Sequence, residues 1–130
     1  MKKKPFTIRF FVILSLSLFG SINAFADSLI IEIPDNPELI TQTSSYQCDM
    51  ETNKEHVEVT YLTAGNIALV DFKWKGKRII GSNVIAASGA KYVGGPYIWW
   101  TKGNEALLYD LVNDPKEEKP IRCVEEKSTE

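Results

Sequence analysis

The sequence predicts an all-β fold. After the first 26 residues, no segment shows ten or more residues of 3.6-residue periodicity, so no amphipathic helix is expected. Seven or eight short apolar or alternating runs occur instead, separated by turn signals such as Ala64-Gly65-Asn66 and Lys75-Gly76-Lys77. Closely spaced strands of this kind indicate a β-sandwich or a β-barrel, and periodicity alone does not separate the two.

The first half of the predicted domain holds four strands. The clearest is Val57–Tyr61, where alternation places Val57, Val59 and Tyr61 on one face. The four expected strands are Tyr46–Asp49, Val57–Tyr61, Ile67–Trp74 and Arg78–Ala86.

The stretch Ala87–Gly103 organises the centre of the chain. Three glycines within seven residues, followed by Pro96, exclude one long regular element, because glycine loses the most backbone entropy on ordering. The pattern predicts a loop at Ala87–Gly89, a strand at Ala90–Val93, a turn at Gly94–Pro96 and a strand at Tyr97–Lys102. An antiparallel pair of this form brings Ser88 and Lys102 to one rim.

The adjacent Trp99 and Trp100 have opposite expected orientations, because successive side chains of a strand point to opposite faces. One indole therefore faces the core and the other faces outward. Two interpretations stay open: both indoles are packing residues, or the outward one offers aromatic area to a partner or a sugar.

The C-terminal part of the domain predicts two further strands. Glu105–Val112 alternates, with Leu107, Tyr109 and Leu111 on one face, and Asn113-Asp114-Pro115 turns the chain. The last expected strand is Ile121–Cys123, and residues 125–130 form a polar tail.

Residues 1–26 have the three parts of a secretory signal peptide. The basic n-region holds Lys2, Lys3, Lys4 and Arg9, the apolar region is Phe10–Phe19, and Ala24-Phe25-Ala26 fits the cleavage rule. An apolar run this short favours a cleaved signal over a membrane anchor, because a hydrocarbon core is about 30 Å thick. Cleavage after Ala26 leaves 104 of the 130 residues, enough for one domain at about 45–124.

Residues 27–44 are expected to form an N-terminal arm, disordered or loosely docked. Leu29–Ile33 is apolar enough for an edge strand, but Pro34 and Pro37 stop it soon afterwards. Thr41–Ser45 is interpreted as a polar linker to the domain.

The charge balance argues against nucleic acid. Four of the 15 basic residues and none of the 17 acidic ones lie in the signal, so the mature chain has a net charge of about −6. Such a chain repels phosphates and suits a cationic partner, although many periplasmic proteins are mildly acidic for solubility alone.

Two cysteines, Cys48 and Cys123, stand near the two ends of the domain. In an oxidising compartment they are expected to form a disulfide. The sequence has no C-x-x-C motif and a single histidine, His56, in a charged turn-like stretch. Neither a metal site, a cofactor nor a catalytic centre is expected, and the acidic pairs Glu117-Glu118 and Glu125-Glu126 are interpreted as charged surface.

Two motifs in the central stretch resemble those of a known family. Ser88-Gly89-Ala90-Lys91-Tyr92 matches S-G-x-x-Y, and Tyr97–Gly103 matches Y-x-x-x-T-K-G. Together they resemble the MliC/PliC family, proteinaceous inhibitors of c-type lysozyme, and the resemblance extends from about Tyr46 to Cys123. It implies an antiparallel eight-stranded barrel with a cysteine pair in comparable places.

The resemblance also implies a partner, a c-type lysozyme, and a set of contacts. In the family, the serine of the first motif and the lysine of the second enter the lysozyme cleft and engage its two catalytic carboxylates. These positions are Ser88 and Lys102 in this chain. Five other motif positions are expected to shape and support the loop: Gly89, Tyr92, Tyr97, Thr101 and Gly103.

The first cysteine is Cys48, so no lipid-attachment cysteine follows the signal, and the resemblance is to the soluble, periplasmic branch. Two alternatives stay open. The protein can be a small periplasmic barrel that binds a sugar or apolar ligand through Trp99 or Trp100, or a purely structural envelope protein. The sequence leaves open the oligomeric state and which lysozymes are inhibited.

Overall fold

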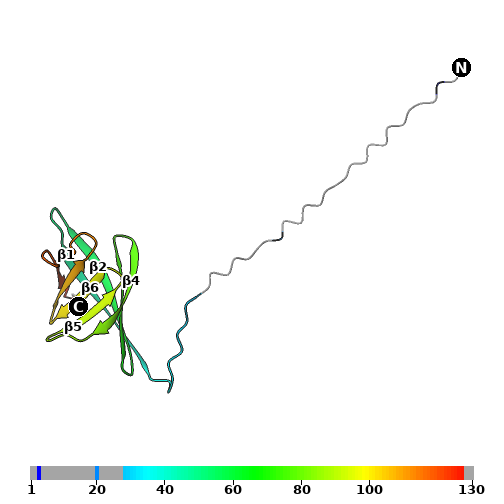
Figure 1. The fold of residues 1–130 in the computed structure, drawn as a ribbon, viewed down its shortest axis with the longest axis horizontal. Helices are drawn as coiled ribbons and strands as arrows, with labels where there is room; N and C mark the ends of the chain where they lie inside the picture. Colours follow the sequence, from blue (N-terminus) through cyan, green and yellow to red (C-terminus); the bar gives the residue numbers. More distant parts are fainter. Residues whose placement is uncertain (1–2, 4–19, 21–27, 128–130) are drawn as a thin grey trace. The chain divides into compact units, whose positions relative to one another are not determined.

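Eight antiparallel strands close into a barrel in the computed structural model, which describes Lys3, Gly20 and residues 28–127 (Figure 1). Each strand pairs with its neighbours in the sequence, and β1 pairs with β8 to close the sheet. No helix occurs among the described residues. The strands are β1 (Leu39–Asp49), β2 (Lys54–Ala64), β3 (Ile67–Trp74), β4 (Lys77–Val84), β5 (Ala90–Gly94), β6 (Tyr97–Lys102), β7 (Glu105–Asp110) and β8 (Ile121–Glu125).

The predicted all-β barrel is confirmed, and β3 and β6 have the predicted bounds. The prediction of β7 was two residues too long. The strand ends at Asp110 because its carboxylate accepts hydrogen bonds from the backbone N–H groups of Val112 and Asn113, at 3.0 and 3.3 Å. Such a side-chain turn competes with continued pairing of the backbone.

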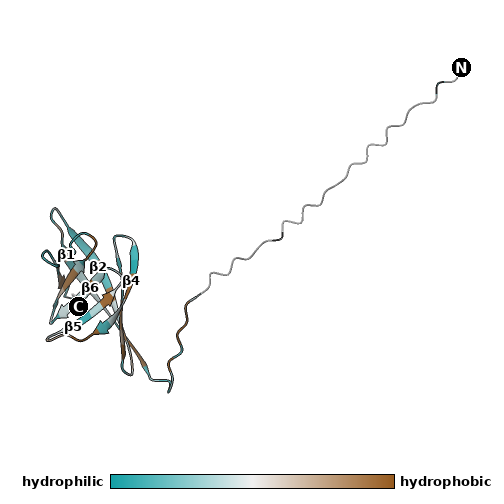
Figure 2. Ribbon diagram, viewed as in Figure 1, coloured by the Kyte–Doolittle hydropathy of each residue, from teal (hydrophilic) through white to brown (hydrophobic). Residues whose placement is uncertain are grey.

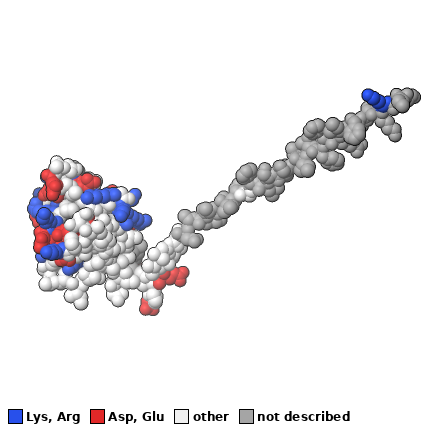
Figure 3. Space-filling model, turned by 45° about the horizontal axis from the view of Figure 1, so that its top comes forward, with Lys and Arg blue, Asp and Glu red and all other residues white. Residues whose placement is uncertain are grey.

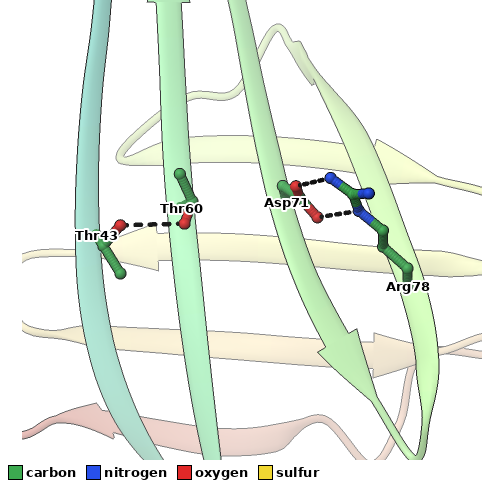
Figure 4. Close-up of polar contacts among 4 residues, drawn as sticks. All are labelled: Thr43, Thr60, Asp71 and Arg78. Carbon is green, nitrogen blue, oxygen red and sulfur yellow. Dashed lines mark hydrogen bonds and ion pairs between the residues drawn. The ribbon is translucent and has the colours of Figure 1, made fainter. Parts of the chain in front are cut away.

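The interpretation of Thr41–Ser45 as a polar linker was wrong. These residues lie in β1, which begins at Leu39 and pairs with β2 over its full length of 11 residues. The hydroxyl groups of Thr43 and Thr60 lie 3.1 Å apart on the outer face of this pair (Figure 4). Polar threonines and serines suit an exposed strand, because one face of an antiparallel sheet meets solvent.

The barrel closes through a short seam between β1 and β8. Only three residue pairs join these strands, and one of them is Cys48 with Cys123, which form the expected disulfide. The bond spans a sequence separation of 75 residues. The covalent link therefore reinforces one of the two shortest pairings of the sheet, the other being that of β4 with β5, which also has three residue pairs.

Aromatic side chains fill the barrel interior. The indole of Trp99 is 1% exposed and lies between the rings of Tyr46 and Phe72, with centroid distances of 5.1 and 5.2 Å. Its Nε1–H donates to the Tyr61 hydroxyl at 2.9 Å, and that hydroxyl lies 2.9 Å from the hydroxyl of Tyr46. Burial raises the pKa of both tyrosines above the ordinary value. Hydrophilic and hydrophobic stretches both occur along the strands (Figure 2).

The inward face of β7 differs from the one that the alternation suggested. Leu107 and Tyr109 share a face as expected, but they are only partly buried. The fully buried residues are their neighbours Ala106 and Leu108. The inward face of β2 is the expected one, since Val57 and Val59 are almost fully buried.

The chain divides into a unit of residues 1–32 and a unit of residues 33–130 that contains the barrel. In the first unit, residues 28–32 form no strand, and Leu29, Ile30 and Ile31 are largely exposed. The possible edge strand at Leu29–Ile33 is therefore not formed. Apart from Lys3 and Gly20, the predicted signal peptide lies outside the described residues. Within the described part of the chain, we find no helix with the length and apolar character needed to cross a membrane.

Candidate protein-binding rim

The hairpin of β5 and β6 brings the two motif segments together. Ala90 pairs with Thr101, so the residues just before β5 lie against the end of β6. Ser88 and Lys102 are both exposed at this end. We call this end of the hairpin, with Ser88, Gly89, Trp100 and Lys102, the binding rim.

Gly89 allows the close approach of the two segments. Its φ of +65° lies in the left-handed region, which side chains other than glycine rarely adopt. A Cβ at this position would clash with the carbonyl oxygen of Thr101 and lie 2.9 Å from Cγ of Lys102. The Ser88-Gly89 backbone can therefore lie on β6 only without a side chain at residue 89.

Trp100 contacts both of the principal motif residues. Its Nε1–H donates to the backbone carbonyl of Ser88 at 2.8 Å, and the Lys102 ammonium lies 4.4 Å from its ring centroid. The ammonium of Lys91, directly across the hairpin, lies 5.0 Å from the same centroid. Such cation–π contacts favour one position of a flexible lysine side chain. The half-buried indole of Trp100 thus fixes the Ser88 backbone and orients Lys102.

The orientations of the two tryptophans agree with the strand alternation. Trp99 faces the core, whereas Trp100 lies on the outer surface of the barrel among charged side chains. Neither Lys91 nor Lys102 forms an ion pair with any residue that the structure describes. Lys102 of the rim and the adjacent Lys91 therefore present two ammonium groups that no ion pair neutralises within the described part of the chain.

The remaining motif residues lie behind or beside the rim. Tyr92 points into the barrel, is 8% exposed and packs against Tyr61 at a centroid distance of 5.9 Å. The hydroxyl of Thr101 donates to the carbonyl of Ala90 at 3.3 Å, which ties β6 to β5. Tyr97 packs against the core at the far end of β6, and Gly103 occupies the turn into β7 with a φ of +61°. In these positions the four residues can support the hairpin that carries Ser88 and Lys102.

Three charged residues near the rim do not follow from the two motifs. Lys91 is at a variable position of the first motif, and Glu105 and Arg122 lie outside both motifs. Glu105 of β7 is the direct partner of Lys102 on β6, and its carboxylate forms an ion pair with Arg122 of β8. The sequence signal that could have placed Glu105 opposite Lys102 is the two-residue turn Gly103-Asn104 between them. The approach of Arg122 depends on the register of β7 with β8.

The titratable residues considered outside the rim form ordinary surface contacts. Nδ1 of His56 lies 3.0 Å from a carboxylate oxygen of Glu126, and this contact lowers the pKa of Glu126. No group of three or more His, Cys, Asp or Glu side chains is placed to hold a metal ion among residues 28–127.

The fold and the rim place the protein in the class of small, disulfide-bonded, closed antiparallel barrels. Its interior is filled with side chains, and a hairpin that depends on a glycine is exposed at one end. Residues 46–117, more than half of the chain, match the family described as membrane-bound lysozyme-inhibitor of c-type lysozyme. The chain belongs to this family.

Proteins described as membrane-bound lysozyme inhibitor of C-type lysozyme are similar to this chain in sequence. The one from Pseudomonas aeruginosa is 42% identical over 81 residues, which cover 61% of each chain. The one from Cupriavidus necator is 39% identical over 67 residues, which cover 52% of this chain and 51% of the relative. The matched segments thus span about half to three fifths of these curated relatives.

The fold also resembles a solved structure, that of Pseudomonas aeruginosa MliC in complex with hen egg white lysozyme. The two chains are 35% identical with a TM-score of 0.62, and the match covers 78% of this chain and 99% of the other.

Proposed function

We propose that this protein is a periplasmic inhibitor of c-type lysozyme that inserts its binding rim into the active-site cleft of the enzyme. The observation that carries the proposal is the position of Ser88 and Lys102, which contact the same indole at one end of the barrel. Membership of the family and the similarity to an MliC that was solved in complex with a lysozyme support the same partner.

The proposed mechanism needs no reaction by the inhibitor. Glycoside hydrolysis uses one carboxylic acid as a proton donor and one carboxylate as a nucleophile or stabiliser. The Ser88 hydroxyl can donate a hydrogen bond to one of these groups, and the Lys102 ammonium can pair with the other. A rim that occupies both groups also excludes the substrate, so the protein acts as a binding protein and not as an enzyme.

The fixed geometry of the rim favours tight binding. Trp100 holds the Ser88 carbonyl and the Lys102 ammonium before the partner arrives, so fewer rotamers are lost on binding. A plug of this type is expected to bury about 1,600 Å² in total.

Charge is proposed to assist the encounter at two levels. The mature chain, with 11 basic and 17 acidic residues after cleavage at Ala26, attracts a basic enzyme. Acidic and basic side chains are interspersed on the face of the barrel in Figure 3, so the attraction is not confined to one single-sign patch. The cationic rim then meets carboxylates in the cleft. Both contributions weaken as salt is added.

The proposed location is the periplasm, in soluble form. The signal-like segment before Asp27 directs export. The predicted arm is shortened to residues 27–38 and the predicted tail to residues 126–130, because Leu39–Ser44 lie in β1 and Glu125 lies in β8. Both cysteines of the sequence, Cys48 and Cys123, are joined in the barrel disulfide. Neither therefore has a free thiol for lipid attachment, whereas the relatives are described as membrane-bound.

Lysis of bacterial cell walls by a c-type lysozyme, with the mature protein titrated in, tests the proposal. Wild type should inhibit near stoichiometrically. Ser88→Ala and Lys102→Ala should each weaken inhibition by roughly 10- to 150-fold, the equivalent of one hydrogen bond to a charged group. Lys77→Ala is the matched control, because Lys77 is an exposed lysine at the start of β4. Wild-type protein that leaves lysis unchanged would refute the proposal, and equal losses in all three variants would refute the assigned contacts.

A further inference from the structure

An acidic side chain stands directly opposite the principal cation of the rim. Lys102 ends β6 and Glu105 begins β7, and the two residues are partners across the turn Gly103-Asn104. Partners in an antiparallel pair point to the same face with Cβ atoms about 4.5–5.5 Å apart, close enough for an ion pair. A Lys102–Glu105 pair is therefore the expected local arrangement.

The structure has a different arrangement. The Glu105 carboxylate accepts a hydrogen bond from the guanidinium of Arg122, on the next strand, and the Lys102 ammonium lies over Trp100 at 4.4 Å from the ring centroid. Arg122 reaches Glu105 diagonally, because its direct partner on β7 is Leu107. The hydrogen bond to Glu105 also raises the pKa of Arg122.

We propose that Arg122 is a positioning residue, which holds Glu105 so that Lys102 remains available for a carboxylate of the partner. This inference rests on the proposed function, because it assigns a consequence to the availability of Lys102. It adds to the determinants of binding a residue outside both motifs, which lies 17 positions after Glu105 in the chain.

The physical basis is competition between two cations for one carboxylate. A guanidinium offers a planar set of donors that fits a carboxylate better than an ammonium does. With Arg122 present, the Glu105 carboxylate is already paired, and the Lys102 ammonium contacts the indole of Trp100 instead. Without Arg122, the Glu105 carboxylate can turn to the ammonium directly opposite.

The expected effect is moderate and calculable. Exposed ion pairs favour the paired state by a factor of about 1.4 to 5. The partner then binds only the fraction of molecules in which Lys102 is free, so the apparent dissociation constant rises by about two- to sixfold.

A four-variant experiment tests the proposal through the inhibition constant for a c-type lysozyme. Arg122→Gln should weaken inhibition two- to sixfold. Glu105→Gln should inhibit at least as well as wild type, because no carboxylate then stands opposite Lys102 to bind its ammonium. The double variant Arg122→Gln/Glu105→Gln should recover wild-type inhibition, which a merely structural contribution of Arg122 would not allow.

Arg78→Gln is the matched control. Arg78 forms the same kind of exposed pair, with Asp71, and its removal changes the net charge equally (Figure 4). Arg78 lies next to the β3–β4 turn and lines a hollow with Gly94–Tyr97, at the opposite end of β6 from Lys102. This variant should inhibit like wild type.

The outcomes separate the two proposals. Wild type that fails to inhibit overturns the proposed function. Wild type that inhibits, with Arg122→Gln as effective as Arg78→Gln, overturns the inference about Arg122 alone. A loss in Arg122→Gln that persists in the double variant also overturns it, because Glu105 then has no part in the effect. Thermal unfolding of each variant checks that the barrel is intact.

Discussion

Substituting Gly89 by alanine should separate the rim from the rest of the barrel. The new Cβ would clash with the Thr101 carbonyl oxygen, lie 3.2 Å from the Thr101 carbonyl carbon and lie 2.9 Å from Cγ of Lys102. A lysine methylene can move aside, but the carbonyl belongs to β6, which pairs on both sides. The Ser88-Gly89 segment must therefore move away from β6.

Two further glycines allow the magnitude to be worked out. Gly95 and Gly103 have φ values of +53° and +61°, close to the +65° of Gly89, but a Cβ at either would have no atom within 4 Å. All three substitutions should lose about 1–2 kcal/mol for a left-handed alanine. Gly89→Ala should lose an additional 0.5–1.5 kcal/mol or so, because moving Ser88 breaks its 2.8 Å hydrogen bond from Trp100.

Urea unfolding and lysozyme inhibition are the two assays. The three variants should unfold at lower urea concentrations than wild type, with Gly89→Ala the least stable. Inhibition should weaken by about two- to tenfold in Gly89→Ala, which corresponds to the lost hydrogen bond, and should stay near wild type in Gly95→Ala. Equal stability and equal inhibition in Gly89→Ala and Gly95→Ala would refute the argument that the close approach to Thr101 shapes the rim.

Three other predictions follow from the same structure. The double substitution Cys48→Ala/Cys123→Ala should reduce the free energy of unfolding by up to about 4.5 kcal/mol in urea titrations, from the loop entropy of a 75-residue separation; an unchanged midpoint would contradict this. Trp100→Phe should weaken inhibition about two- to tenfold with little change in melting temperature, because the ring remains but the donor to Ser88 is lost; full inhibition would show that the Ser88 carbonyl does not need this donor. Burial raises the pKa of Tyr46 and Tyr61, so their contribution to stability is complete below the ordinary tyrosine pKa of about 10 and is lost as the pH rises above it. Tyrosine absorbance should therefore titrate together with unfolding at alkaline pH, and reversible titration of these tyrosines in the folded protein would contradict it.

Strand bounds could be predicted from the sequence where turn residues mark both ends of the strand. The bounds of β3 and β6 were predicted correctly, because each strand lies between turns that contain glycine. β1 was predicted too short, because Thr41–Ser45 has the composition of a linker. Composition reports solvent exposure, and a strand of which one edge is paired and one face is solvated is exposed over most of its length.

The direction in which a strand faces was harder to predict than its existence. In β7, Ala106 and Leu108 alternate with Leu107 and Tyr109, so both faces are apolar and period-two alternation does not identify the inward one. The disulfide fixes it in the structure. Ala106 pairs with Cys123, which is fully buried, so Ala106 must point inward with it.

The same argument explains which parts of the rim were predictable. Ser88 and Lys102 belong to one hairpin, whose register follows from the turn at Gly94–Pro96, so their approach could be inferred locally. Arg122 reaches the rim only through the pairing of β7 with β8, across a connection of ten residues whose length fixes no register. A shift of one residue in that pairing would turn Arg122 to the other face, so that Arg122 would no longer compete with Lys102 for the Glu105 carboxylate. The availability of Lys102 thus depends on a register that the seam disulfide helps to hold, since Cys123 is the next residue after Arg122.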